Sequence, residues 1–349
     1  MTLIGGHRGV LSAFGALVAA LGIAAPAQAT FPGGNGRIAY TWSRGGEGFE
    51  DGPSPRLVGV ISVRPDGEGR RLVARGGTRP AYSPNGRRIA FMLSGRVWVA
   101  RANGDDAQPV TPSDWAVGEY GWSPAGTRLA FDRGFKNSGA SVLYSVRANG
   151  TGLQRLLKTP LGIGLSGGAW SPNGKAIVYG QSSTGQPLVR IFRDGHIITL
   201  ARPAVAPTWS RRGLIAFVTT GTGDELNQVC VMRPDPGASR RCIGFADASV
   251  SDPSWSPDGG RLMLMYQPQG PAEIWTVRPD GTVLTRAPRD NTFPIFSPDG
   301  DSLAFSEARF AGQARLEYED LFAMRPDGTA KRRLVRGGQV NSPDWQPLH

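Results

Sequence analysis

The clearest catalytic pattern in the sequence is a G-x-S-x-G motif, Gly164-Leu-Ser-Gly-Gly168, which is typical of serine hydrolases. In those enzymes the serine (here Ser166) lies where a strand turns sharply into a helix, and no helical stretch follows it in this sequence. A serine nucleophile also needs a base, and His196 is the only histidine away from the chain ends. His196 belongs to a different turn, so we predict no catalytic residue from this motif.

Two cysteines, Cys230 and Cys242, lie at equal distances from Pro236 within a predicted hairpin. Residues placed in this way face each other on paired strands, and in an exported protein they favour a cross-strand disulfide. Two small buried thiols are the alternative. Redox catalysis would need C-x-x-C spacing, and a cysteine metal cluster would need more cysteines.

Two segments far apart in the sequence are rich in carboxylates. Hard cations such as Ca²⁺ bind several carboxylate oxygens, so the two segments together could form an acidic rim that holds Ca²⁺ or a cationic ligand. Neither has the spacing of an EF-hand, and solvated loops are the alternative interpretation. We predict no other metal and no cofactor. The carboxylates are Glu47, Glu50, Asp51, Glu317, Glu319 and Asp320.

We predict that the first 29 residues are a signal peptide. Arg8 provides the positive start, Val10 to Ala25 is apolar, and Ala27-Gln-Ala29 fits a cleavage site. A membrane anchor would need about 20 strongly apolar residues, more than this run provides. No cysteine follows, which disfavours a lipoprotein. We expect export to the periplasm, or secretion or cell-wall association, with one domain over residues 30–349.

Composition narrows the class of protein further. The 349 residues include 39 Lys and Arg against 28 Asp and Glu, a net charge of +11. Such an excess is common in proteins that bind nucleic acids or anionic surfaces. The chain has nine tryptophans and 40% hydrophobic residues, more than is typical of a disordered protein, so we expect a folded hydrophobic core. The 49 glycines and 28 prolines indicate many turns.

The elements that must position these residues come from a repeat. An aromatic-Ser-Pro-x-Gly turn followed by an apolar strand recurs, as in Tyr82-Ser-Pro-Asn-Gly86 before Ile89-Ala-Phe91. The aromatic anchors are 39 to 49 residues apart, the length of a propeller blade. The anchors are Tyr82, Trp122, Trp170, Trp209, Trp255, Phe296 and Trp345.

A second repeated element is a strand that ends in Arg-Pro-Asp-Gly or a relative, as at Arg64 and Arg325, which predicts seven hairpins. Each unit therefore holds four strands. The chain starts with a second strand, Arg37 to Tyr40, and ends with a first strand at Trp345. We predict an all-β, seven-bladed propeller of four-stranded antiparallel blades, closed by the C-terminal strand joining blade one, with six or eight blades as alternatives.

The Trp-Ser-Pro-Asp-Gly-x-x-Leu/Ile-Ala-Phe pattern followed by x-Asp-Gly resembles the TolB-type, WD-like β-propeller repeat of bacterial periplasmic proteins. The resemblance covers Gly36 to Trp345. In TolB itself an α/β domain precedes a six-bladed propeller that partners an outer-membrane lipoprotein. Related propellers precede α/β-hydrolase domains in prolyl-oligopeptidase-like peptidases. Here the repeat begins just after the expected cleavage site, so we expect a propeller without the TolB N-terminal domain.

The repeat defines two faces of the propeller. The Ser-Pro-x-Gly and Pro-Asp-Gly turns form a regular turn face, and the opposite loop face carries connections of variable length, such as Thr41 to Leu57 and Ser306 to Glu319. Binding sites concentrate in variable loops, so we expect a ligand at a central funnel on the loop face, although ordinary solvated lining is the alternative. The polar residues expected just before the innermost strands are Arg79, Glu119, Ser166, Asp252, Asn291 and Asn341.

Arginines repeat around the turn face. They could form a ring that binds polyanions, but repetition in every blade favours a structural role in which each binds a nearby Asp or stacks on an aromatic ring. We therefore predict a non-enzymatic, monomeric propeller that binds an envelope protein, a polysaccharide or another polyanion, and not nucleic acid. The alternatives are a carbohydrate-active hydrolase or lyase with carboxylates in the funnel, and a structural module of an envelope assembly.

Overall fold

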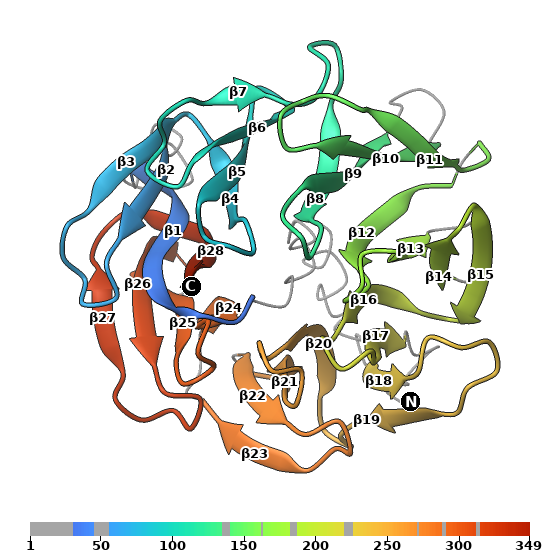
Figure 1. Cartoon of the computed structure of the whole chain (residues 1–349). Coiled ribbons are helices and arrows are strands. Elements are labelled where there is room, and N and C mark those ends of the chain that lie inside the picture. The colour runs from blue at the N-terminus through green and yellow to red at the C-terminus, as the bar shows by residue number, and fades with distance from the viewer. Residues whose placement is uncertain are drawn as a thin grey trace, which may run out of the picture.

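The computed structural model describes residues 31–44, 56–134, 140–161, 163–181, 187–219, 226–270, 272–287, 291–311 and 315–349. These residues form strands and turns, and the strands assemble into seven four-stranded sheets. The sheets stand as blades around a common axis, with one strand of each sheet innermost (Figure 1). The predicted signal peptide lies outside the described residues. Within the described part, we find no helix with the length and apolarity needed to cross a bilayer.

Blades are numbered in chain order, and their strands are given from the axis outward. Blade 1 contains β28 (Gln339–Leu348), β1 (Gly34–Arg44), β2 (Arg56–Val63) and β3 (Arg71–Arg75). Blade 2 contains β4 (Thr78–Tyr82), β5 (Arg88–Leu93), β6 (Arg96–Arg101) and β7 (Gln108–Pro109). Blade 3 contains β8 (Val117–Trp122), β9 (Arg128–Gly134), β10 (Ser141–Arg147) and β11 (Gln154–Lys158).

The remaining blades follow the same order. Blade 4 contains β12 (Leu165–Trp170), β13 (Ala176–Gln181), β14 (Leu188–Arg193) and β15 (His196–Ala201). Blade 5 contains β16 (Val205–Trp209), β17 (Ile215–Thr219), β18 (Gln228–Met232) and β19 (Arg240–Ile243). Blade 6 contains β20 (Ser249–Trp255), β21 (Leu262–Gln267), β22 (Glu273–Val277) and β23 (Val283–Arg286). Blade 7 contains β24 (Asn291–Phe296), β25 (Leu303–Ala311), β26 (Arg315–Met324) and β27 (Arg332–Val335).

The ring closes through the two ends of the chain. Strand β28 pairs antiparallel with β1, with Trp345 opposite Ile38 and Asp344 opposite Ala39. This confirms the predicted seven blades and the predicted closure, and it excludes six or eight blades. Because β28 pairs with β1 in blade 1 and also packs against blade 7, blades 7 and 1 are neighbours.

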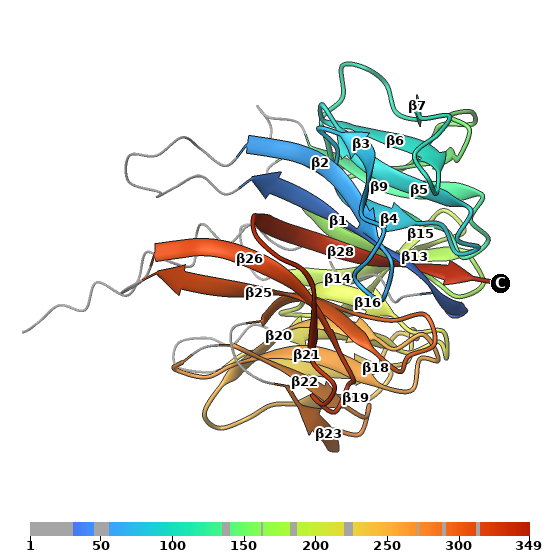
Figure 2. The same ribbon diagram turned by 90° about the vertical axis from the view of Figure 1, so that its left-hand side faces the viewer.

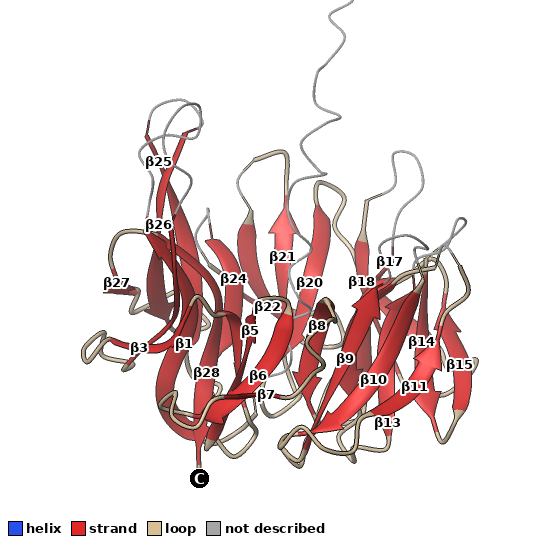
Figure 3. Ribbon diagram, turned by 90° about the horizontal axis from the view of Figure 1, so that it is seen from above, coloured by secondary structure: helices blue, strands red, loops and turns tan. Residues whose placement is uncertain are grey.

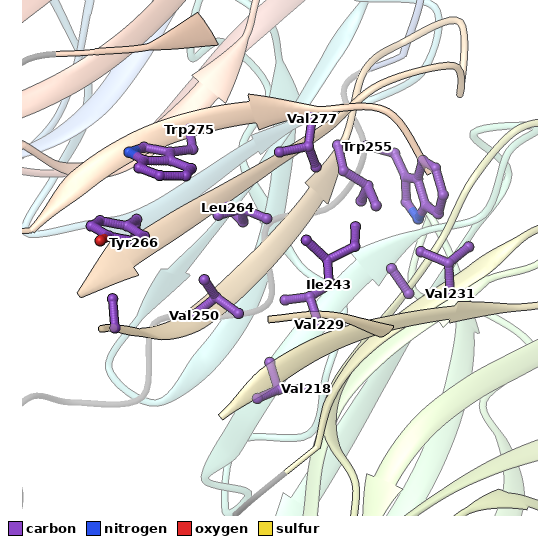
Figure 4. Close-up of a cluster of buried hydrophobic side chains, with 13 residues drawn as sticks. Val218, Val229, Val231, Ile243, Val250, Trp255, Leu264, Tyr266, Trp275 and Val277 are labelled. Carbon is purple, nitrogen blue, oxygen red and sulfur yellow. The ribbon is translucent and has the colours of Figure 1, made fainter. Parts of the chain in front are cut away.

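The hydrophobic core lies between adjacent blades. Figure 4 shows one such cluster, in which Val229 and Ile243 of blade 5 face Val250, Trp255 and Leu264 of blade 6. Both faces of each sheet are covered by neighbouring blades, which explains why second strands such as β13 are buried along their whole length. Trp122, Trp255 and Trp345 are buried core residues between blades, and Trp170 is partly buried.

The repeat turns fold as their residue types require. At Ser83-Pro-Asn-Gly86 the Gly86 N–H donates to the Ser83 carbonyl at 2.8 Å, and the Ser83 side chain accepts the N–H of Arg88 at 3.0 Å. Gly86 has φ of 65°, a conformation that glycine tolerates best. Trp122 then donates its indole N–H to the carbonyl of Ala81 in the preceding blade at 3.0 Å. Trp170 and Trp255 make the same contact with their preceding blades, through the carbonyls of Gly121 and Thr208.

One expected loop proves to be a hairpin. We expected Ser306 to Glu319 to form a loop, but β25 and β26 extend through most of this stretch, with Ala311 paired to Arg315. This hairpin projects beyond the loop face, opposite the C-terminus (Figures 2 and 3). Backbone pairing between β25 and β26 continues to Ala311 and Arg315, and this antiparallel pairing replaces the expected loop.

Candidate functional site at the axis of the ring

The innermost strand of each blade contains a β-bulge shortly before its repeat aromatic, where the pairing with the second strand shifts register. In five blades the residue three positions before the aromatic has a positive φ between 49° and 53°. Each of these five residues is followed by proline, whose missing N–H is tolerated at a bulge. They are Arg79, Ala206, Asp252, Phe293 and Ser342.

The x-Pro dipeptide before the aromatic is therefore a sequence signal for the bulge that the repeat motifs alone did not reveal. Bulges change the direction of a side chain relative to a regular strand. The bulges thus create one comparable position per blade around the axis, and the residue type at that position differs from blade to blade. Blades 3 and 4 carry Glu119 and Gly167 there without a following proline.

The six predicted funnel residues lie within the innermost strands, although we expected them just before those strands. The strands begin earlier than expected because pairing continues past the bulge toward the loop face. Arg79, Glu119 and Asp252 occupy the bulge position itself. Asn341 pairs with Thr41 of β1. For Ser166 in β12 and Asn291 in β24, only the backbone is described.

Arg79 connects three blades. Its backbone N–H donates to Oγ1 of Thr41 in blade 1 at 2.8 Å, and its Nη1 donates to the carbonyl of Gly118 in blade 3 at 2.8 Å. Its Nη2 lies 4.0 Å from Oε1 of Glu119, at the limit of an ion pair. The Tyr120 hydroxyl donates to the Arg79 carbonyl. Neighbouring blades therefore hold Arg79 in place.

Asp132 in β9 is the partner of the strand segment that Arg79 contacts. Its Oδ1 accepts the backbone N–H of Glu119 at 2.6 Å, and a Cβ at Gly118 would come within 2.4 Å of its Oδ2. A side chain at position 118 would therefore require the Asp132 carboxylate to move. Burial raises the pKa of Asp132, against the opposing effects of this hydrogen bond and of Arg79.

Asp252 lies at the bulge of blade 6. Its side chain is exposed to solvent, and its Oδ2 accepts a hydrogen bond from the Ser251 hydroxyl at 2.8 Å. The pKa of Asp252 is nevertheless raised, because protein surrounds the carboxyl group at the axis and partly desolvates it. Asp252 thus combines access to solvent with an environment that disfavours its negative charge.

Asp344 in β28 is a site residue that we did not predict from the sequence. Its Oδ2 accepts the Tyr82 N–H of blade 2 at 2.5 Å, and desolvation raises the pKa of Asp344 to about 7. The repeat contained a signal for it, since the residue before the aromatic is small or apolar in most other blades and carries a carboxylate only here. The corresponding residues are Ala81, Gly121, Ala169, Thr208, Ser254 and Ile295.

Glu119, Asp132, Asp252 and Asp344 are named the axial acids here. None is fully buried, and three have raised pKa values. Arg79 is the cation that the structure places beside Glu119, and its guanidinium already donates to the backbone carbonyl of Gly118. An excess of carboxylates in a partly desolvated environment favours the binding of a cationic group.

The acidic rim is only partly described. Glu47, Glu50 and Asp51 lie outside the described residues, and for Glu317 only the backbone of β26 is described. Burial raises the pKa of Glu319 to about 7. In the described ranges, no three His, Cys, Asp or Glu side chains are grouped closely enough to hold a metal ion.

Asp320, which we expected on the acidic rim, lies inside blade 7. It is fully buried, its Oδ1 accepts the Gly337 N–H at 2.7 Å, and its Oδ2 lies 3.4 Å from Nη1 of Arg333. Asp320 therefore fixes the turn between β27 and β28 inside the blade and does not face solvent on the rim.

The other sequence motifs occupy structural positions. The G-x-S-x-G motif continues into β12, and the segment that follows is a turn leading to β13, so the strand-to-helix elbow of serine hydrolases is not formed. His196 is exposed at the start of β15, next to the turn face. Cys230 and Cys242 are directly paired across β18 and β19 and joined by a disulfide.

Several turn-face arginines have local partners, as the structural interpretation predicted. Arg64 pairs with Asp66 at 3.2 Å, and Arg212 with Asp258 at 2.9 Å. Arg70 stacks over Trp42 with 4.0 Å between its guanidinium carbon and the ring centroid. Such contacts stabilise the turns and blades and do not form a preformed anion site.

Comparisons with known proteins agree with this architecture. No family model matches the chain. An uncharacterized protein of Agrobacterium fabrum is 24% identical over 280 residues, covering 77% of this chain and 80% of that protein. A TolB homolog of Chlorobium luteolum is 33% identical over 112 residues, which is 31% of this chain and 24% of the homolog.

Solved structures with this fold include TolB and several enzymes. TolB from Acinetobacter baumannii has a TM-score of 0.55 and 17% identity, covering 89% of this chain and 67% of TolB. An oligogalacturonate lyase in complex with manganese has a TM-score of 0.60 and 12% identity, covering 88% of this chain and 86% of the lyase. The resemblance to TolB-type β-propellers is confirmed at the level of the fold. Identities this low carry no activity across to this chain.

Proposed function

We propose that this chain is an exported, non-enzymatic β-propeller that binds an envelope partner from its loop face and holds a cationic group of that partner at the axial acids. The observation that carries the proposal is the placement of Glu119, Asp252 and Asp344 on three of the innermost strands around the axis, where desolvation raises the pKa values of Asp252 and Asp344. A lysine or arginine side chain placed there would stabilise the charged form of these carboxylates, which desolvation disfavours.

The class of partner follows from the geometry and the fold. The bound group that we propose is an organic cation, the side chain of a lysine or an arginine. The likeness to TolB favours a protein partner over a polymer. We also propose cleavage after Ala29, which would place the mature chain outside the cytoplasm.

The decisive experiment is capture of envelope proteins by the immobilised chain starting at Thr30, comparing Asp252→Asn and Glu119→Gln with the unchanged chain. We expect each variant to weaken capture by at least about tenfold, because a desolvated charge pair loses one member. Asp301→Asn is the matched control, since Asp301 is an exposed carboxylate on the turn face. Equal capture by all variants would exclude the axial site.

A carbohydrate-active enzyme is the second candidate, and one observation favours it. Asp252 is an exposed carboxyl group with a raised pKa, the combination expected of a general acid. Incubating the chain alone with acidic and neutral glycans distinguishes the two functions. Turnover that Asp252→Asn abolishes would establish the enzyme, whereas capture without turnover supports the binding protein.

A further inference from the structure

The N-terminal segment Phe31–Gly34, named the strap here, crosses the turn face close to the axis. At one end, the Gly33 N–H donates to the Pro298 carbonyl of blade 7 at 3.2 Å. At the other end, Phe31 packs against the hydrophobic cluster of blades 2 and 3 that contains Trp122. Two residues of chain reach at most about 7 Å, so the strap passes near the axis and does not follow the rim of the ring.

The strap forms one wall of a pocket with a volume of about 350 Å³. The opposite walls come from the Ser-Pro turns of blades 2 to 4 and from the aromatic anchors of blades 3 to 5. Proline rings and indole faces are apolar and flat, and such surfaces bind aromatic and proline side chains. The main lining residues are Pro84, Pro124, Pro172, Trp122, Trp170 and Trp209.

The C-terminus meets the strap at the same place. His349 lines the pocket, and its Nε2 lies 2.9 Å from the Pro84 carbonyl. Gly33 fits closely against the closing strand, because a Cβ there would lie 2.7 Å from the Leu348 carbonyl oxygen. The backbone of the strap is therefore fixed by blades 7 and 1, which leaves Phe31 and Pro32 directed to the pocket.

We propose that the prolines and tryptophans on the opposite walls of this turn-face pocket form a binding site for an aromatic–proline peptide segment, and that the chain's own Phe31–Pro32 is the segment that lies against it. The strap acts as an intramolecular ligand on the turn face, close to the axis. The pocket and the strap stand on their own contacts, so this inference does not depend on the function proposed above.

The test uses a synthetic peptide, Thr-Phe-Pro-Gly-Gly, which copies residues 30–34. Its binding is measured by isothermal calorimetry and by tryptophan fluorescence against three chains. They start at Thr30, start at Gly34, or start at Thr30 with Phe31→Ala. We expect the peptide to bind the chain from Gly34 and the Phe31→Ala chain at least about tenfold more tightly than the chain from Thr30, where the strap competes.

The controls distinguish binding at this pocket from nonspecific binding of the peptide. Thr-Ala-Pro-Gly-Gly should bind more weakly than the phenylalanine peptide, and Leu161→Ala, a change at an exposed leucine, should leave binding as in the chain from Thr30. If the chain from Gly34 does not fold by circular dichroism, the Phe31→Ala chain carries the test. Absence of peptide binding to folded Phe31→Ala, or equal binding to all chains, would overturn the proposal.

Discussion

The turn face and the axis of the ring are formed by the same repeat but differ in what is repeated. On the turn face, the same hydrogen bonds recur in blade after blade, such as glycine N–H to serine carbonyl at Gly86, Gly126 and Gly259. At the axis, the backbone bulge recurs while its side chain changes, from Arg79 to Asp252. Repetition therefore marks the residues that hold the propeller together, some of which also line the pocket beside the strap. Departure from repetition marks the side chains that differ from blade to blade at the axis.

This comparison predicts the largest loss of stability for a repeated core residue. Trp255 is fully buried between blades and donates its indole N–H to the Thr208 carbonyl at 3.4 Å. Trp255→Ala should lower the free energy of unfolding by about 3–5 kcal/mol, measured by denaturant titration. Asp252→Ala, three residues away at the axis, should leave it nearly unchanged. A similar loss for both variants would break the distinction between repeated and variable positions.

Two copies of the same turn should respond differently to one substitution. Gly86 and Gly213 both have positive φ, so alanine at either costs about 1 kcal/mol. A Cβ at Gly86 would also lie 1.8 Å from the Pro347 carbonyl oxygen, whereas nothing lies within 4 Å of one at Gly213. Gly86→Ala should therefore lower the free energy of unfolding by about 3 kcal/mol in all. Thermal unfolding of the two variants measures this difference. An equal loss of stability in Gly213→Ala and Gly86→Ala would contradict the prediction.

The third prediction concerns the pH dependence that Asp344 confers. Its carboxyl group has a pKa of about 7 in the folded chain against 3.8 ordinarily, so between these values the folded chain binds more protons than the unfolded chain. The stabilising contribution is complete at acid pH and is lost as the pH rises toward 7. From pH 5 to pH 8, the unchanged chain should lose on the order of 2 kcal/mol more than Asp344→Asn.

The asparagine variant is a suitable comparison because its Oδ1 can still accept the Tyr82 N–H. Urea titrations at the two pH values provide the measurement, with Asp301→Asn as a variant that should retain the slope of the unchanged chain. Parallel slopes for the unchanged chain and Asp344→Asn would show that Asp344 titrates as an ordinary carboxyl group.

The fold could be predicted from the sequence because its signals are local. Each aromatic-Ser-Pro-x-Gly turn, as at Ser83 and Gly86, specifies its own hairpin, and the offset between Tyr40 and Trp345 indicates how the ring closes. The ends of the strands were less predictable, because pairing past a bulge depends on a neighbouring strand that the repeat motif does not describe.

The candidate site was only partly predictable for a related reason. Arg79, Glu119 and Asp252 were found because polar residues near an aromatic anchor stand out. Asp344 was not predicted because a repeat motif lists only the residues that its copies share, and the carboxylate before the aromatic occurs in a single copy. Asp320 was misplaced, since its burial comes from Gly337 and Arg333, which are distant in sequence and meet it only in the folded blade.

The smallest effect should follow from removing an exposed ion pair on the turn face. Nη2 of Arg212 in blade 5 lies 2.9 Å from Oδ2 of Asp258 in blade 6, with both side chains more than half exposed. Arg212→Ala should lower the free energy of unfolding by less than about 1 kcal/mol in a chemical denaturation experiment, because solvent already screens the pair. It should also leave envelope capture unchanged at physiological salt, since the guanidinium is engaged between blades. Capture that falls with Arg212→Ala, and disappears in moderate salt, would instead place the binding surface on the turn face.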